Sequence, residues 1–184
     1  MPLSREVFFM QSARGPRFAI ATRPERSPLG GLLYLHPFAE EMNRSRRMAA
    51  LAARAFARDG WLVLQPDLTG CGDSAGDFAD AGWQHWLDDV SSAWAWLQTN
   101  CKGAPLVLWT LRAGSLLAAD WLARTGETPA LLLWQPVLQG QQALTQFLRL
   151  KAASQMLDES QSRTAIKTLR ADLEAGRSVE IAGY

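Results

Sequence analysis

Cysteine and histidine are scarce in this sequence, and their scarcity excludes several classes of protein. The 184 residues include two cysteines, Cys71 and Cys101, and two histidines, His36 and His85. Two thiols do not build the disulfide framework of a small secreted protein, so we expect a protein of the reducing cytoplasm. The four side chains are scattered without ligand spacing, and no phosphate-loop or dinucleotide fingerprint is present. We therefore expect neither a metal site nor a cofactor.

A large net charge and long apolar runs are also missing. The 19 lysine and arginine residues nearly balance 18 aspartate and glutamate residues, so the charge balance does not predict nucleic-acid binding. Apolar runs such as residues 130–134 are far shorter than the ~20 residues that span a bilayer. Residues 1–10 do not resemble a signal peptide. Hydrophobic residues make up 48% of the chain, and we expect about one globular domain with a substantial core.

The sequence does contain a repeated alternation of strand-like and helical segments. Residues 7–11 and 17–21 flank turn residues and predict a β-hairpin. Further strands are predicted at 31–35, 61–64, 105–111 and 130–134, and helices at 40–58, 83–97 and 113–124. This order predicts an α/β fold, a mainly parallel sheet with helices on both faces. The apolar face expected for the first helix consists of Met48, Leu51, Ala52, Ala55 and Phe56.

Composition changes after Gln139, and Gly140 marks a break. Residues 1–139 carry the strand–helix alternation. Residues 140–176 are polar and helix-prone, which predicts a helical cap-like insertion. Residues 177–184 resemble the start of a further strand. We expect either a truncated chain or a sheet edge that is covered by a second copy or by a partner protein.

Residues 110–114, Thr-Leu-Arg-Ala-Gly, end a strand-like run and open a helical one. A nucleophile elbow has this context, with the reactive side chain at the centre of a sharp turn. Here the central residue is Arg112, and Thr110 replaces the first glycine. A guanidinium stays protonated at any working pH and cannot attack a carbonyl. The pattern therefore indicates a hydrolase scaffold without its usual nucleophile.

Three segments carry a family resemblance: residues 35–47 (Leu-His-Pro-Phe-Ala-Glu-Glu-Met-Asn-Arg-Ser-Arg-Arg), residues 67–74 and residues 111–114. They resemble the exosortase A system-associated hydrolases, α/β-hydrolase-superfamily proteins encoded beside exosortase and exopolysaccharide genes. The resemblance implies an α/β-hydrolase fold and hydrolysis of ester or thioester bonds in a small-molecule or acyl substrate. It also implies a triad acid and histidine after the cap. Because no histidine follows His85, we expect either a fragment or a pseudoenzyme.

Two interpretations of Arg112 stay open. In the first, Arg112 and the backbone amides of Ala113 and Gly114 form an anion-binding or oxyanion site at a helix N-terminus. By analogy with hydrolases, the loop after the 31–35 strand adds the amide of Phe38 or Ala39. In the second interpretation, Arg112 pairs with an acidic residue and fills an inactive pocket. The acidic partners open to it are Glu40, Glu41 and Asp67, and the sequence does not choose between Glu40 and Glu41.

Four other residues are candidates for catalysis, each with a structural alternative. Cys71 lies in the Gly-rich loop and is either a reactive thiol or a core filler. Ser74 is either a nucleophile or a residue that caps this loop. Ser115 is either a nucleophile or a residue of the first helical turn that faces away from the pocket. His36 ends a buried strand, where an imidazole is either catalytic or a hydrogen-bonded structural group.

Overall fold

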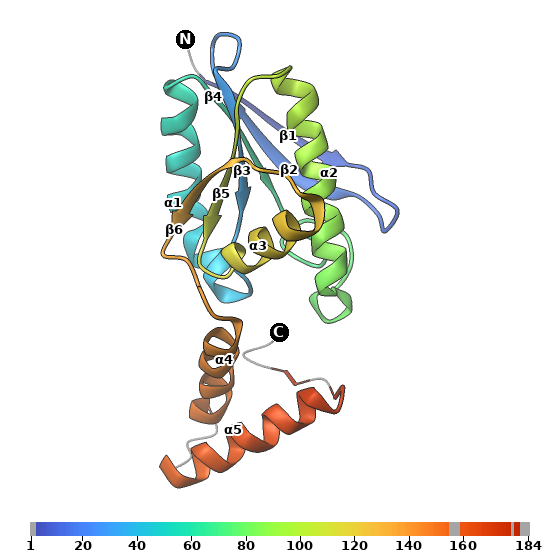
Figure 1. Cartoon of the computed structure of the whole chain (residues 1–184), viewed down its shortest axis with the longest axis vertical. Helices are drawn as coiled ribbons and strands as arrows, with labels where there is room; N and C mark the ends of the chain where they lie inside the picture. The colour runs from blue at the N-terminus through green and yellow to red at the C-terminus, as the bar shows by residue number, and fades with distance from the viewer. Residues whose placement is uncertain (1–2, 155–158, 178, 181–184) are drawn as a thin grey trace. The chain divides into compact units, whose positions relative to one another are not determined.

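One mixed sheet organises the first part of the chain (Figure 1). The computed structural model describes residues 3–154, 159–177 and 179–180. Six strands lie in the order β1-β2-β4-β3-β5-β6. Their bounds are β1 Ser4–Met10, β2 Arg17–Arg23, β3 Gly30–Leu35, β4 Trp61–Pro66, β5 Leu106–Leu111 and β6 Ala130–Trp134.

The central strands of the sheet run parallel. β3 pairs in parallel with β4 and β5, and β5 pairs in parallel with β6. β1 and β2 form the predicted antiparallel hairpin, and β2 joins β4 antiparallel. Because β3, β5 and β6 point the same way, the loops that follow them meet at one edge of the sheet. The prediction of a mainly parallel sheet is confirmed.

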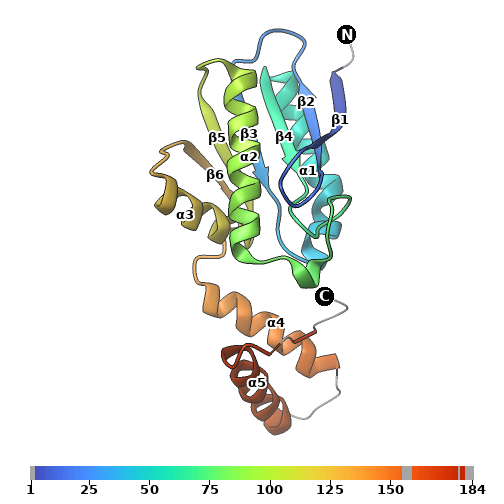
Figure 2. The same ribbon diagram turned by 90° about the vertical axis from the view of Figure 1, so that its right-hand side faces the viewer.

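Helices cover both faces of the sheet (Figure 2). Helix α1 (Glu40–Arg58) packs on one face, and α2 (Trp83–Cys101) and α3 (Gly114–Thr125) pack on the other. A short 3-10 helix, η1 (Phe78–Asp80), precedes α2. Side chains alternate along the strands as a sheet requires, so that Leu32 and Tyr34 face α1 while Leu33 and Leu35 face α2 and α3.

The apolar face predicted for α1 is wrong in part. Met48 and Leu51 are 60% and 45% exposed. The buried residues are instead Met42, Ala49, Ala53 and Ala57. Tyr34 and Trp109 of the sheet fill the space below this helix, which leaves room for alanine rather than for larger side chains.

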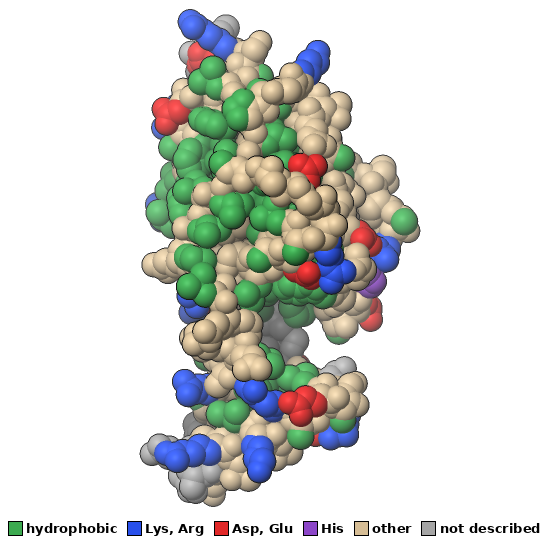
Figure 3. Space-filling view, in the orientation of Figure 1, with side chains coloured by type: hydrophobic (Ala, Val, Ile, Leu, Met, Phe, Trp, Pro, Cys, Tyr) green, Lys and Arg blue, Asp and Glu red, His purple; other side chains and the backbone are tan. Residues whose placement is uncertain are grey.

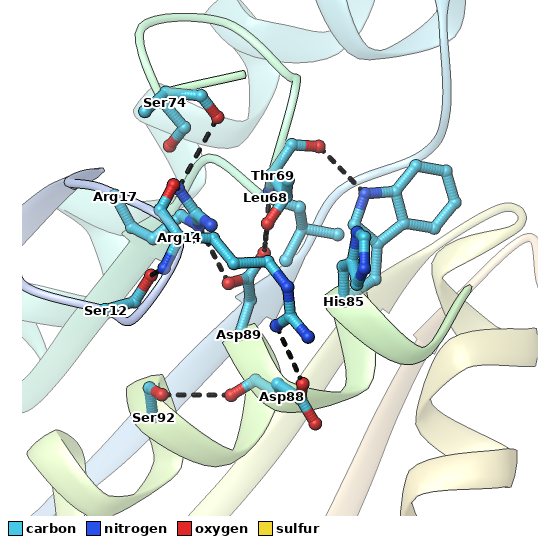
Figure 4. A network of polar contacts seen from close by, with 12 residues as sticks. Ser12, Arg14, Arg17, Leu68, Thr69, Ser74, His85, Asp88, Asp89 and Ser92 are labelled. Carbon is cyan, nitrogen blue, oxygen red and sulfur yellow. Dashed lines mark hydrogen bonds and ion pairs between the residues drawn. The ribbon is translucent and has the colours of Figure 1, made fainter. Parts of the chain in front are cut away.

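A buried ion pair fixes the Gly-rich loop that follows β4 (Figure 4). Arg17 donates from Nε to Oδ1 of Asp89 at 2.8 Å, and the two side chains are 1% and 5% exposed. Oδ2 of Asp89 accepts hydrogen bonds from the backbone and the hydroxyl of Thr69, both at 2.6 Å. The loop is thereby joined to α2 and to the hairpin.

The chain divides into two compact units, residues 1–137 and 138–184. The second unit contains α4 (Gly140–Ser154) and α5 (Glu159–Glu174), which pack together. Nη2 of Arg170 donates to Oγ1 of Thr145 at 2.8 Å. The cap role of residues 140–176 stays a prediction. The strand start predicted at 177–184 lies mostly outside the described residues, and the described residues 177, 179 and 180 are not in a strand.

Candidate functional site

The turn between β5 and α3 has the sharp backbone geometry that the sequence predicts. Arg112 at its centre has a φ of 51°, a left-handed conformation that is uncommon for a residue with a side chain. Its N–H donates to the carbonyl of Trp134 at 3.0 Å, and its carbonyl accepts from the N–H of Val137 at 3.3 Å. Hydrogen bonds to the end of β6 and to the segment after it thus hold the backbone of this turn in place.

Backbone strain gathers at the same edge of the sheet. Ala39 follows β3 with a φ of 53°, and Gln135 follows β6 with a φ of 43°. Among the described residues, four that are not glycine have a positive φ: Ala39, Arg112, Gln135 and Lys102. Only Lys102 lies away from this edge. Each such conformation costs about 1–3 kcal/mol and concentrates at functional sites. The ends of β3, β5 and β6 are therefore the candidate site.

Gly114 brings the loop after β3 against the N-terminus of α3. A Cβ atom on Gly114 would lie 2.4 Å from the carbonyl oxygen of Leu35 and 3.0 Å from that of His36. No side chain fits in this space. The loop that carries Phe38 and Ala39 therefore begins directly beside the turn that carries Arg112.

Four backbone N–H groups at this edge have no hydrogen-bond acceptor among the residues that the structure describes. They belong to Phe38, Ala39, Ala113 and Gly114. The last two open α3, whose N-terminus carries a partial positive charge. The sequence predicts the amides of Ala113 and Gly114, with that of Phe38 or Ala39, as donors to an anion, and this role stays a prediction.

Arg112 contacts Glu41 and not its neighbour Glu40. Nε of Arg112 lies 3.3 Å from Oε1 of Glu41, and the side chains are 33% and 44% exposed. Glu40 instead pairs with Arg44 at 2.8 Å, and Asp67 pairs with Arg46 at 2.9 Å. The two terminal nitrogens of Arg112 have no partner within the described ranges. Part of the guanidinium therefore remains available.

Aromatic rings line the loop after β3. The ring of Phe38 stacks on Trp86 at 4.6 Å and meets the edge of Trp83 at 6.0 Å. Nε1 of Trp83 donates to Asp120 on α3 at 2.7 Å. The amides of the loop thus lie next to apolar surface, which suits a ligand with both a charged and an apolar part.

His36 is buried and has both ring nitrogens engaged. Nδ1 lies 2.7 Å from the carbonyl of Pro37, and Nε2 accepts from the N–H of Leu68 at 3.3 Å. Burial lowers the pKa of His36 below its usual value of 6.5. These contacts favour the structural alternative, a neutral imidazole that holds the loops after β3 and β4 together.

Cys71 also lies in the core. Burial, followed by the charges of Asp67 and Asp89, raises the pKa of its thiol to about 12. A thiol with that pKa carries almost no thiolate at neutral pH, and the thiolate is the reactive form. The geometry therefore favours the core-filler alternative for Cys71.

The two serines hold backbone in place. Oγ of Ser74 donates to the carbonyl of Asp67 at 2.6 Å and accepts from the N–H of Phe18 at 2.9 Å. Oγ of Ser115 lies 2.8 Å from the carbonyl of Arg112 and 2.9 Å from that of Val137. Ser74 thus anchors the Gly-rich loop to β2, and Ser115 fastens the turn at Arg112.

Two parts of this edge were not predicted from the sequence. The first is the contact between Arg112 and Glu41, although the four-residue spacing of Glu40 and Arg44 predicts a helical ion pair that leaves Glu41 free. The second is the strained backbone at Gln135. No signal in the sequence marks that position as strained, because glutamine is common in ordinary loops.

A sheet with parallel central strands in this order, together with a strained turn after β5, defines a protein of the α/β-hydrolase fold. The family model described as serine aminopeptidase, S33, matches residues 26–175. The chain belongs to that family, and the predicted α/β-hydrolase superfamily is confirmed.

Solved structures agree on the fold. The chain is similar to a soluble variant of the monoglyceride lipase of Saccharomyces cerevisiae, with 14% identity over 82% of the chain and a TM-score of 0.62. It is similar to a lipase in its open form, with 23% identity over 79% and a TM-score of 0.61. A carboxyl esterase from Bacillus coagulans shows 23% identity over 72% and a TM-score of 0.57.

These structures are longer than the chain. It covers 52% of the yeast lipase, 51% of the open-form lipase and 44% of the esterase. A comparison with curated proteins gives no significant match. None of the described helices is both long enough and apolar enough to cross a membrane.

Proposed function

We propose that the turn at Arg112 binds an anionic group, a carboxylate above all, without hydrolysing the ligand that carries it. The observation behind the proposal is the position of Arg112, which has a φ of 51° between β5 and α3. A guanidinium at this point attracts negative charge and cannot serve as a nucleophile.

The surroundings of Arg112 favour an anion-binding site over the alternative in which Arg112 and its acidic partner fill an inactive pocket. The contact with Glu41 joins two partly exposed side chains at 3.3 Å, and such pairs are worth at most about 1 kcal/mol. The terminal nitrogens of Arg112 match the two oxygens of a carboxylate. The amides of Ala113 and Gly114 add donors at the start of α3. The contacts of a bound carboxylate with Arg112 and these amides would contribute more free energy than the loss of the Arg112–Glu41 pair costs.

Titration of the folded protein with butyrate tests this proposal. The wild type is expected to bind, and Arg112→Ala is expected to bind at least about tenfold more weakly, since a hydrogen bond to a charged group contributes roughly 1.5–3 kcal/mol. Equal affinity of the two proteins would refute the proposal.

Hydrolysis of an ester or thioester is the second candidate, and membership of the serine aminopeptidase family favours it. It requires a nucleophile other than residue 112, or water activated by a carboxylate. Treatment with a fluorophosphonate, and separately with iodoacetamide at limiting dose, tests this candidate by intact mass. A stoichiometric adduct on Ser74, Ser115 or Cys71 would support hydrolysis. Absence of adducts on folded protein would support the binding function.

The biological setting in this proposal is an exosortase or exopolysaccharide system in the cytoplasm. Its support is the resemblance of residues 35–47 to the exosortase-associated group. Co-purification of the tagged protein with the products of neighbouring genes tests the setting.

A further inference from the structure

A hollow in the surface lies at the opposite end of the sheet from the Arg112 turn. Its volume is about 690 Å³, and its polar lining consists of Arg5, Glu25, Arg26, Arg54 and Arg58. Three segments contribute: the start of β1, the β2–β3 connection and the C-terminal end of α1. Figure 1 shows these segments together at the end of the core unit that lies away from the β5–α3 turn.

The arginines of this hollow differ from the others in the core unit. Twelve arginines lie within residues 3–137. Seven of them form ion pairs with carboxylates: Arg14, Arg17, Arg23, Arg44, Arg46, Arg112 and Arg124. The side chains of the other five form neither an ion pair nor a hydrogen bond with a described residue, and four of these five line the hollow; the five are Arg5, Arg26, Arg47, Arg54 and Arg58. Cations without partners are thus concentrated at one place.

The dipole of α1 accounts for only part of this arrangement. A helix C-terminus favours nearby cations, and Arg58 lies in the last turn of α1. Arg5 on β1 and Arg26 between β2 and β3 are not part of that helix. Like charges brought together from separate segments repel one another, so a bound anion would relieve the repulsion.

We propose that this hollow binds a ligand that carries clustered phosphoryl groups. The planar fork of a guanidinium matches two phosphate oxygens, and several such groups suit a polyphosphate or phosphomonoester better than a single carboxylate. The volume lies within the range of about 300–1,000 Å³ that is usual for small-molecule sites. The proposal is independent of the function proposed for Arg112, because the two sites share no residue.

Calorimetric titration with tripolyphosphate tests the proposal, in an Arg112→Ala background that removes the other candidate site. The background protein is expected to bind. Arg26→Ala and Arg54→Ala, each added to it, are expected to weaken binding at least about tenfold. Arg47→Ala is the matched control, because Arg47 also lies on α1, its side chain has no partner among the described residues, and it does not line the hollow. It is expected to change the affinity by less than about twofold.

A second arm distinguishes the source of the phosphoryl groups. The same proteins are sedimented with phosphatidylcholine vesicles that contain phosphatidic acid. Vesicle binding that is lost in Arg26→Ala and Arg54→Ala, with no binding of tripolyphosphate, assigns the hollow to a lipid headgroup. Binding of neither probe overturns the proposal. Equal weakening by Arg47→Ala also overturns it, because the attraction would then be general to the basic surface.

Discussion

Arg112 and Glu41 face each other across the carboxyl edge of the sheet, with Nε and Oε1 3.3 Å apart. One comes from the turn after β5 and the other from the first turn of α1. The pair holds a cation in the position of a nucleophile, beside amides that have no acceptor among the described residues. An anionic ligand would compete with Glu41 for the same guanidinium.

Removal of that competition is expected to tighten anion binding. Glu41→Gln keeps the shape of the side chain and deletes its charge, so the affinity for butyrate should rise by roughly two- to fivefold. The free energy of unfolding should change by less than about 0.5 kcal/mol, because both side chains are partly exposed. Calorimetry and urea denaturation measure the two quantities. Weaker binding in this variant would mean that Glu41 positions Arg112 rather than competing with the ligand.

Gly114 is expected to be essential for the site. In Gly114→Ala, the Cβ would lie 2.4 Å from the carbonyl oxygen of Leu35, so the turn and the loop after β3 must separate. We expect a loss of about 1–3 kcal/mol in stability and the loss of butyrate binding. Gly126→Ala is the control, since that position lies at the far end of α3 with open space around it. Its φ of 70° strains an alanine there as well, so this variant is expected to lose stability but to keep butyrate binding. Retained binding in Gly114→Ala would separate the site from this contact.

The buried carboxylate of Asp89 is expected to contribute far more to stability than its neighbour Asp88. Asp89→Ala leaves Arg17 charged and buried, and the expected cost is about 3–5 kcal/mol. Asp88→Ala breaks only exposed contacts, the ion pair with Arg14 and a hydrogen bond from Gln84, and the expected cost is below about 1 kcal/mol. Chemical denaturation of both variants tests this, and similar costs would contradict the burial argument.

His36 is expected to make the fold sensitive to acid. Its pKa is lowered in the folded state, so below pH 6.5 the unfolded chain binds a proton that the folded chain does not. The stability due to neutral His36 is complete above that pH and decreases as the pH falls. Urea denaturation between about pH 8 and pH 5 should show this slope, and His36→Gln should reduce it. An unchanged slope in His36→Gln would assign the acid sensitivity to other groups.

The sequence predicted the order of strands and helices because near-continuous apolar runs and amphipathic segments each reflect local burial. It also located the strained turn, since Arg112 occupies a strand–turn–helix context that few folds use. The face of α1 was harder to predict. Alanine is buried against Tyr34 and Trp109, whose bulk determines how much room the helix has.

The choice of Glu41 over Glu40 had a local signal, since the four-residue spacing of Glu40 and Arg44 predicts a helical ion pair that leaves Glu41 free. The hollow lined by arginines had no such signal. The hollow of arginines is assembled from three segments far apart in the sequence. The nearly neutral charge of the whole chain conceals it, because most of the other arginines of the core unit are paired with carboxylates.

Butyrate titration of the wild type, Arg112→Ala and Arg124→Ala is the most direct test of the central claim. Arg124 lies in the last turn of α3, the helix that follows Arg112, and pairs with Asp120 at the surface, so its removal matches the change in charge away from the turn. We predict saturable binding to the wild type and to Arg124→Ala, with at least about a tenfold loss in Arg112→Ala. Equal binding by all three proteins, or no binding by the wild type, would contradict it.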